Sequence, residues 1–270
     1  MSANAKLSGQ LENLPLSWRQ GMSLHRQAGG LVVARFFGAE LTSVFQPVVE
    51  PVSGKRVGYE AFVRCHARGD AALSPWSLFS LVADDETLVE LDRLCRILHV
   101  LNDPREHEGE LLFLNVHGRL LAAVSEDHGR FFHRVLQALG KRPRSIVIET
   151  PESACREPDL LSFVFTNYRL NGFQVAANVT SVEEAGVVLD RVRPEFIKAD
   201  TRHVSTAPPR TALHARVREQ GGTRLLFTRV ASVGEVLALR ALPDVLVQGY
   251  ALGGPVPPSL AEHGGLLMAG

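Results

Sequence analysis

The sequence has few cysteines, and their spacing excludes several kinds of chemistry. Cys65, Cys95 and Cys155 are odd in number and lie far apart in the 270-residue chain. This pattern matches neither a disulfide framework, nor a zinc-binding cysteine cluster, nor a redox pair. We therefore expect reduced thiols that pack in the interior of a cytoplasmic protein.

The chain also lacks long hydrophobic runs, an excess of one charge and a histidine metal motif. Its apolar runs are short, as at residues 31–34, so no membrane-spanning helix is predicted. Residues 1–10 contain no apolar signal-peptide core, which favours a cytoplasmic location. Lys plus Arg and Asp plus Glu both number 29, so the charge balance does not predict direct nucleic-acid binding. The 10 histidines include no HExxH pairing.

Short apolar segments rich in β-branched residues recur along the chain, and segments with helical periodicity separate most of them. Strands are predicted at residues 43–49, 56–63, 111–116, 145–149, 173–178, 195–199, 224–230 and 245–248. Strands that alternate with helices favour an α/β barrel. The linker between the first two strands is too short for a crossover helix, so these two strands should pair antiparallel.

Helix boundaries are marked by capping residues. Ser74 and Pro75 predict a helix start, a break is expected near Gly129, and Ser181 with Glu184 has the spacing of a capping box. The predicted helical segments are residues 74–101, 119–139, 181–192 and 232–242.

The first 40 residues differ from the rest. They are amphipathic in places and are interrupted by Gly29 and Gly30. We predict an N-terminal helical arm or cap over residues 1–40, a barrel domain over 41–262 and a C-terminal tail over 263–270.

Five short motifs follow one another at the predicted strands. They are FQPVVEPVSGKRVGYEAFVR (45–64), FLNV (113–116), VIETPE (147–152), FIKAD (196–200) and VQGYALGGPVP (247–257). Their order and spacing resemble those of the EAL domain family, a bacterial phosphodiesterase module that linearises cyclic di-GMP. The resemblance covers about residues 41–260. It implies a TIM-like (β/α) barrel with an antiparallel second strand.

The resemblance also implies a site at the mouth of the barrel. In active members of the family, Mg²⁺ or Mn²⁺ bound by carboxylates and an amide activates a water for attack on the phosphodiester. Glu60, Asn115 and Glu149 correspond to metal ligands, and Gln46 and Arg64 correspond to residues that contact the dinucleotide. The further site positions implied by the resemblance are Glu152, Lys198 and Gln248.

Two loops depart from the pattern of the family. Gap-free counts from the neighbouring motifs align Ala177, Asn178, Thr228 and Ala231 with acidic residues of active members, and Arg229 with a glycine. Loss of even an outer partner of a metal typically costs about 10–100-fold in affinity or activity. We therefore expect no bound metal and no functional catalytic residues.

Three functions stay open. The first is a catalytically inactive EAL-like regulatory protein that acts through protein–protein interaction in cyclic di-GMP-linked control of motility or biofilm. The second is a metal-independent receptor for cyclic di-GMP, and the third is a weak phosphodiesterase that uses other ligands. The candidate partners are a regulatory protein, cyclic di-GMP and a second copy of the chain. The candidate ligand-binding residues are Gln46, Arg64, Lys198, Arg229 and Gln248.

Overall fold

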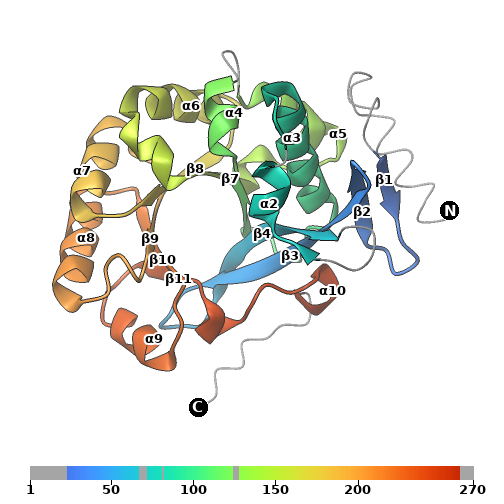
Figure 1. Cartoon of the computed structure of the whole chain (residues 1–270). Coiled ribbons are helices and arrows are strands. Elements are labelled where there is room, and N and C mark those ends of the chain that lie inside the picture. Colours follow the sequence, from blue (N-terminus) through green and yellow to red (C-terminus); the bar gives the residue numbers. More distant parts are fainter. Residues whose placement is uncertain (1–22, 67–71, 81, 124–127, 262–270) are drawn as a thin grey trace.

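The computed structural model describes residues 23–66, 72–80, 82–123 and 128–261. Eight strands form a closed barrel in the order β3-β11-β10-β9-β8-β7-β6-β4, which the pairing of β3 with β4 completes. Helices surround this barrel (Figure 1). The predicted α/β barrel is therefore confirmed. The barrel strands are β3 (Ala39–Val49), β4 (Arg56–His66), β6 (Leu111–Asn115), β7 (Ile146–Thr150), β8 (Gln174–Val179), β9 (Phe196–Asp200), β10 (Arg224–Thr228) and β11 (Val245–Val247).

One strand runs against the others. β3 is antiparallel to both of its neighbours, β4 and β11, whereas the other pairs in the barrel are parallel. The antiparallel pairing predicted from the short linker is therefore confirmed. The strand of reversed direction is the first of the pair, β3, because β4 already runs parallel to β6.

The helices begin and end largely where capping residues predict, with one correction. Segment 74–101 forms two helices instead of one, because Asp84 accepts a hydrogen bond from the Thr87 amide at 2.8 Å and starts a second helix. The break at Gly129 is confirmed. The helices are α2 (Pro75–Ser80), α3 (Asp85–Leu101), α4 (Gly118–Ala123), α5 (Arg130–Ala138), α6 (Pro158–Leu170), α7 (Val182–Arg191), α8 (Ala207–Gln220), α9 (Val233–Leu239) and α10 (Pro258–Ala261), with 3₁₀ turns η2 (Pro143–Ser145), η3 (Glu152–Arg156) and η4 (Tyr250–Leu252).

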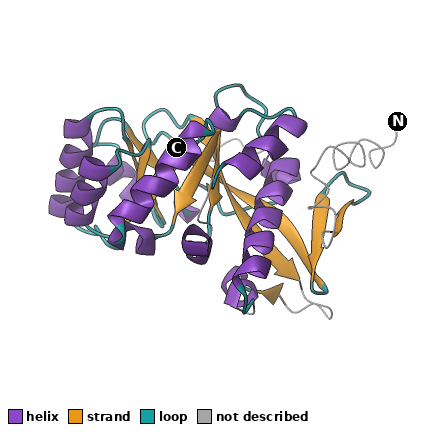
Figure 2. Cartoon of the chain, turned by 90° about the horizontal axis from the view of Figure 1, so that it is seen from above, coloured by secondary structure: helices purple, strands orange, loops and turns teal. Residues whose placement is uncertain are grey.

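The N-terminal part of the described chain is a β-hairpin. β1 (Ser23–Arg26) pairs antiparallel with β2 (Val32–Phe36), and β2 pairs antiparallel with β3. The helix predicted over residues 1–40 is therefore wrong for residues 23–40, and residues 1–22 lie outside the described residues, as does the predicted tail. The hairpin lies beside the barrel (Figure 2), and the short β5 (Ala72–Leu73) pairs with β4.

Two apolar layers hold the barrel. The outer layer lies between the strands and the helices. The inner layer closes the barrel axis, and β4 contributes Gly58 there because a Cβ at this position would lie 2.0 Å from the Leu111 carbonyl oxygen. Over the part of the chain that the structure describes, no helix combines the length and the apolarity needed to cross a membrane. The inner layer consists of Val48, Phe113, Val147, Ala176, Phe196, Leu226 and Leu246.

Candidate functional site

One polar side chain from each barrel strand or its end lies next to the inner apolar layer. Side chains alternate across a strand, so the residue two positions from an interior apolar residue also faces the interior. All of these polar residues line one cavity of about 1170 Å³ at the mouth of the barrel. We call them the polar ring. Its members are Gln46, Glu60, Asn115, Glu149, Asn178, Lys198, Thr228 and Gln248.

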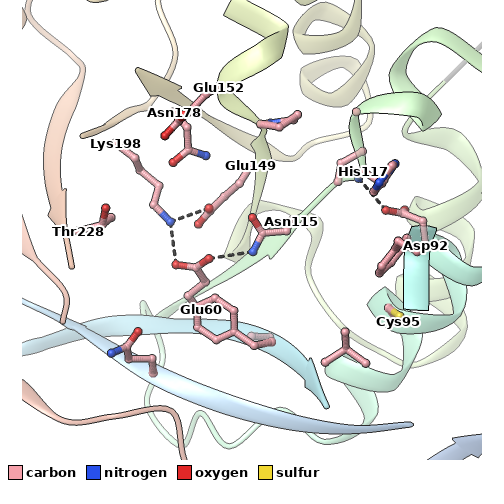
Figure 3. Close-up of a pocket in the computed structure, with 18 of the residues that line it drawn as sticks. Glu60, Asp92, Cys95, Asn115, His117, Glu149, Glu152, Asn178, Lys198 and Thr228 are labelled. Atoms are coloured by element: carbon pink, nitrogen blue, oxygen red, sulfur yellow. Dashed lines mark hydrogen bonds and ion pairs between the residues drawn. The ribbon is translucent and has the colours of Figure 1, made fainter. Parts of the chain in front are cut away.

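The centre of the polar ring is a buried ion cluster (Figure 3). Lys198 Nζ lies 2.8 Å from Glu60 Oε2 and 2.5 Å from Glu149 Oε2. The three side chains are only 2%, 7% and 1% exposed, respectively. Asn115 Nδ2 donates a hydrogen bond of 2.8 Å to the other oxygen of Glu60. One ammonium group therefore binds two carboxylates from different strands.

Burial and neighbouring charges shift the ionisation of this cluster. Burial, together with the nearby Glu60 carboxylate, raises the pKa of Glu149 from 4.5 to about 7, although Lys198 opposes this shift. Burial alone would lower the pKa of Lys198, but the two carboxylates outweigh burial and raise it above 10.5. Lys198 is therefore charged at neutral pH, whereas Glu149 titrates near neutral pH.

A second ionic group lies at the rim of the cavity. Asp200, whose side chain is 6% exposed, forms an ion pair with Arg229 Nε at 3.1 Å and accepts a hydrogen bond from Arg202 Nη2 at 2.6 Å. Burial alone would raise the pKa of Asp200, but hydrogen bonds from Arg202 outweigh burial and lower it. The two guanidinium groups are 65% and 62% exposed, respectively. Sequence reasoning did not single out Asp200, although it follows Lys198 by two residues and so belongs to the same strand face.

The opposite wall of the cavity comes from α3, which sequence reasoning also missed. Asp92 Oδ2 lies 2.8 Å from Arg96 Nη2, and both side chains are 3% exposed. Asp92 Oδ1 also accepts a hydrogen bond from the His117 amide at 2.9 Å, and the His117 ring stacks on Phe79. The spacing of Asp92, Arg96 and His99 places them on one face of α3, which was the available signal. Burial lowers the pKa of His99 to about 3, so this side chain is neutral.

A comparison with models of protein families identifies the family to which this chain belongs. Residues 34–255 match the model of the EAL domain. The chain belongs to the EAL domain family. No curated protein sequence matches this EAL domain significantly.

Solved structures agree with this family. The Bacillus subtilis YkuI protein, with an EAL domain, in complex with cyclic di-GMP and calcium has 20% identity and a TM-score of 0.66 over 80% of this chain and 55% of that chain. The Klebsiella pneumoniae BlrP1 manganese/cyclic di-GMP complex has 19% identity and a TM-score of 0.66 over 94% of this chain and 65% of that one. The PaMucR phosphodiesterase in complex with cyclic di-GMP has 18% identity and a TM-score of 0.64 over 82% of this chain and 99% of that chain. This EAL domain thus spans less than two thirds of YkuI and BlrP1, and the likeness at these identities concerns the fold.

Some site positions inferred from the resemblance lie away from the polar ring. Ala177 is fully buried in the outer apolar layer, so Asn178 is the β8 residue that faces the cavity. Arg64 and Ala231 are not among the described residues that line the cavity. Arg64 Nη1 instead donates to the Val63 carbonyl oxygen at 3.1 Å. Glu152 lines the cavity at its exposed edge.

The oxygen ligands that this EAL domain offers at its mouth are mostly neutral or already occupied. Asn178 Nδ2 donates a hydrogen bond of 2.8 Å to the Thr150 carbonyl oxygen, and Thr228 supplies only a hydroxyl. Glu60 and Glu149 both bind Lys198. Over the described ranges, no group of three or more His, Cys, Asp or Glu side chains is placed to hold a metal ion.

The loop after β8 is held by a changed capping arrangement. Ser181 Oγ accepts a hydrogen bond from the Glu184 amide at 3.1 Å, as predicted for a helix N-cap. The Glu184 carboxylate, however, binds the amide and hydroxyl of Thr180 at 2.6 and 2.9 Å. In a full capping box it would bind the amide of Ser181. Glu184 therefore fixes the loop one residue further upstream.

The loop after β10 keeps an unusual backbone conformation. Arg229, which we expect from the gap-free count to align with a glycine of the family, has a φ of 59°. Few residues other than glycine adopt this left-handed conformation. The following helix, α9, begins with a full capping box of Ser232 and Glu235. The backbone thus adopts a conformation suited to glycine, while the side chain of Arg229 adds a positive charge at the cavity.

Proposed function

We propose that this EAL domain is a catalytically inactive regulatory protein that acts through protein–protein interaction in cyclic di-GMP-linked control of motility or biofilm. One observation carries the proposal. The ammonium group of Lys198 lies between Glu60 and Glu149, which are the two acids of the polar ring.

The ligand set supports the loss of catalysis. A divalent cation at the mouth would supply an activated water and would neutralise charge on the phosphodiester. Such a cation prefers several anionic oxygen ligands. Here each acid of the ring shares an oxygen with Lys198, and β8 and β10 contribute Asn178 and Thr228. The residues present therefore do not fit a hard divalent cation.

A hydrolysis assay tests this part of the proposal. Purified protein is incubated with cyclic di-GMP and Mn²⁺ or Mg²⁺, and the linear dinucleotide is quantified, with the PaMucR phosphodiesterase as the positive control. We expect no product above that of the Glu60→Gln variant. Metal-dependent turnover well above this variant would contradict the proposal and favour the weak phosphodiesterase.

Complementation tests the regulatory part. In the bacterium that encodes the chain, deletion of its gene should change motility or biofilm formation. We expect Glu60→Gln to restore the phenotype as well as the unchanged protein does, because an interaction surface does not need the acid. Failure of a folded, normally abundant Glu60→Gln variant would show that the chemistry of the mouth is required.

A second function, metal-independent binding of cyclic di-GMP, is favoured by the open cavity. Its volume of about 1170 Å³ is somewhat larger than that of typical ligand sites, which are ~300–1000 Å³. BlrP1 has also been solved with FMN and cyclic di-GMP and no metal ions. Calorimetry in EDTA tests this function, and the affinity should be the same with and without added Mn²⁺. Binding that is abolished by EDTA would contradict it.

A further inference from the structure

The turn between β2 and β3 contains a residue that suits its backbone poorly. Phe37 and Gly38 alone connect the two strands, because Phe36 pairs with Ala39. Their φ angles are 44° and 83°, as in a type I′ turn. Asparagine, aspartate and glycine favour the first of these positions, whereas a bulky side chain there is strained. Phe37 is the only apolar residue among the described non-glycine residues with positive φ, which also include Arg193, Arg229 and Asp244.

The ring of Phe37 gains almost no burial in return for this strain. It is 86% exposed, the largest value among the exposed large hydrophobic residues that the structure describes. The ring packs edge-to-face on Phe36, with 4.8 Å between the ring centroids. A turn that only connected two strands would be less strained and better solvated with asparagine at position 37. An aromatic residue that is both strained and exposed is instead typical of a binding position.

Arg35 adds a positive charge beside this ring. Its side chain is exposed and forms no ion pair with another residue that the structure describes. Its cross-strand neighbour Glu40 instead accepts a hydrogen bond from Gln27 Nε2 at 3.4 Å. The next residue in this row is His66, which is also exposed. The tip of the hairpin therefore combines an apolar ring with a cation that has no described counter-ion.

The turn is separate from the cavity, although both lie at the same end of the barrel. Glu40 pairs with His66, the last residue of β4, whereas Gln46 pairs with Glu60 of the polar ring. Six residues of a strand span about 20 Å, so the turn projects well beyond the polar ring. A protein that contacts the turn does not need to enter the cavity.

We propose that Phe37 and Arg35 form the centre of a protein-docking site. The ring of Phe37 enters an apolar pocket of a regulatory protein, and an acidic side chain at the edge of that pocket pairs with Arg35. The site rests on the proposed function, since it names the surface through which the interaction takes place. A lipid surface fits less well, because one ring on a turn offers far less apolar area than an amphipathic helix or an acyl chain.

Phe37→Asn separates docking from folding. Asparagine followed by glycine is a preferred sequence of a type I′ turn, so we expect the melting temperature to rise by about 2–4 °C. The same substitution should abolish docking. A gain in stability together with a loss of docking cannot result from misfolding. Val52→Asn is the matched control, because Val52 lies in the turn at the other end of β3, is 72% exposed and has no positive φ.

Photo-crosslinking of the full chain in the bacterium that encodes it tests the contact. A photoreactive phenylalanine analogue is placed at position 37 in one strain and at position 52 in another. We expect an adduct with a different protein from position 37 but not from position 52, and a lower yield when Arg35→Glu is added. An adduct with a second copy of the chain, an adduct with lipid, or no adduct would overturn the docking site.

Titration of the crosslinked protein, once purified, measures the contribution of each residue. Phe37→Asn should weaken its binding at least about 30-fold, the effect of a hot-spot residue. Arg35→Glu should weaken it about 3- to 10-fold, and Val52→Asn less than about 2-fold. Equal affinities of Phe37→Asn and the unchanged protein would overturn the site. A lower melting temperature of Phe37→Asn would also overturn it, because the ring would then serve the fold.

Complementation of the gene deletion distinguishes the docking site from the proposed function. Val52→Asn should restore the motility or biofilm phenotype, whereas Phe37→Asn at normal abundance should not. Full restoration by Phe37→Asn would overturn the docking site and leave the proposed function intact. A deletion without any phenotype would contradict the proposed function, while the crosslinks and the affinities would still decide whether the tip binds a protein.

Discussion

Lys198 Nζ lies 2.5 Å from Glu149 Oε2, and the side chains of both residues are almost completely buried. Removal of the ammonium would leave two carboxylates without their counter-charge. We predict that Lys198→Met lowers the free energy of unfolding by about 3–5 kcal/mol, as measured by urea denaturation.

The control for Lys198→Met removes the acids as well. A triple variant that combines Lys198→Met with Glu60→Gln and Glu149→Gln should recover much of the lost stability, because no unpaired charge remains. A loss below about 1 kcal/mol in the single variant would show that water reaches the two acids easily.

Glu149 should make the stability depend on pH. Its pKa is raised to about 7 from 4.5, so the folded protein holds this proton more tightly than the unfolded chain. Its contribution is fully present below pH 4.5 and is lost as pH rises to about 7. The unfolding free energies of Glu149→Gln and of the unchanged protein are measured between pH 5 and 8. We predict that the difference between them shifts in favour of Glu149→Gln by about 1 kcal/mol per pH unit until the pH reaches the pKa of Glu149. Parallel curves for the two proteins would contradict the shift.

Restoring the acids of the family pattern should not restore hydrolysis. We predict that the combination of Ala177→Asp, Asn178→Asp, Thr228→Glu and Ala231→Glu gives no turnover with Mn²⁺ and a lower melting temperature. Ala177 lies in the outer apolar layer, so an aspartate there would be buried without a partner and would face away from the cavity. A displacement of about 1 Å can itself cost on the order of 100-fold in rate.

Thr228→Glu alone is the control for that combination, because Thr228 already faces the cavity. Its melting temperature should change less than that of the fourfold variant. Robust hydrolysis by the fourfold variant at unchanged stability would mean that missing ligands were its only defect.

Gly249 should tolerate no side chain. A Cβ there would lie 2.1 Å from the carbonyl oxygen of Val230, with which the neighbouring Ala251 amide forms a hydrogen bond. We predict that Gly249→Ala separates the loop after β10, which contains Val230, from the loop after β11, which contains Gly249. The substitution should lower the unfolding free energy by about 1–3 kcal/mol and weaken the binding of any ligand at Gln248. The measurements are urea denaturation and calorimetry.

Gly234 supplies the matched control for Gly249. It lies in α9, and the nearest atom to an added Cβ is 3.9 Å away. Gly234→Ala should therefore be neutral or should stabilise the protein by up to about 1 kcal/mol, since alanine favours the helix. Equal destabilisation by both substitutions would contradict the steric argument.

The barrel strands were readable from the sequence because apolar β-branched segments locate them. The residues of the polar ring were inferred from the resemblance to the EAL domain family and not from local pattern alone. The Ala177 and Asn178 pair shows the limit of position counting. A count of residues treats the two alike, whereas the alternation of the strand sends one side chain to each face. The resemblance therefore identified the right strand end but not which residue of the pair faces the cavity.

The N-terminal hairpin could not be predicted from local pattern alone. Val32 pairs its amide and carbonyl groups with the side chain of Asn102, a residue 70 positions away. Such a contact depends on the folded barrel and leaves no periodic signal near residue 32. Asp200 is a different case, since its spacing from Lys198 was visible, but its two arginine partners come from separate turns of the chain.

The apolar layer beneath the polar ring has a kinetic consequence. Because Phe113, Phe196 and their neighbours fill the barrel axis, a molecule bound in the cavity cannot pass through the barrel. Entry and exit must use the same opening, where Arg229 and the largely exposed Tyr250 lie. The residence time of a ligand would therefore be set by these rim residues, and substitutions there would change the dissociation rate constant more than the association rate constant.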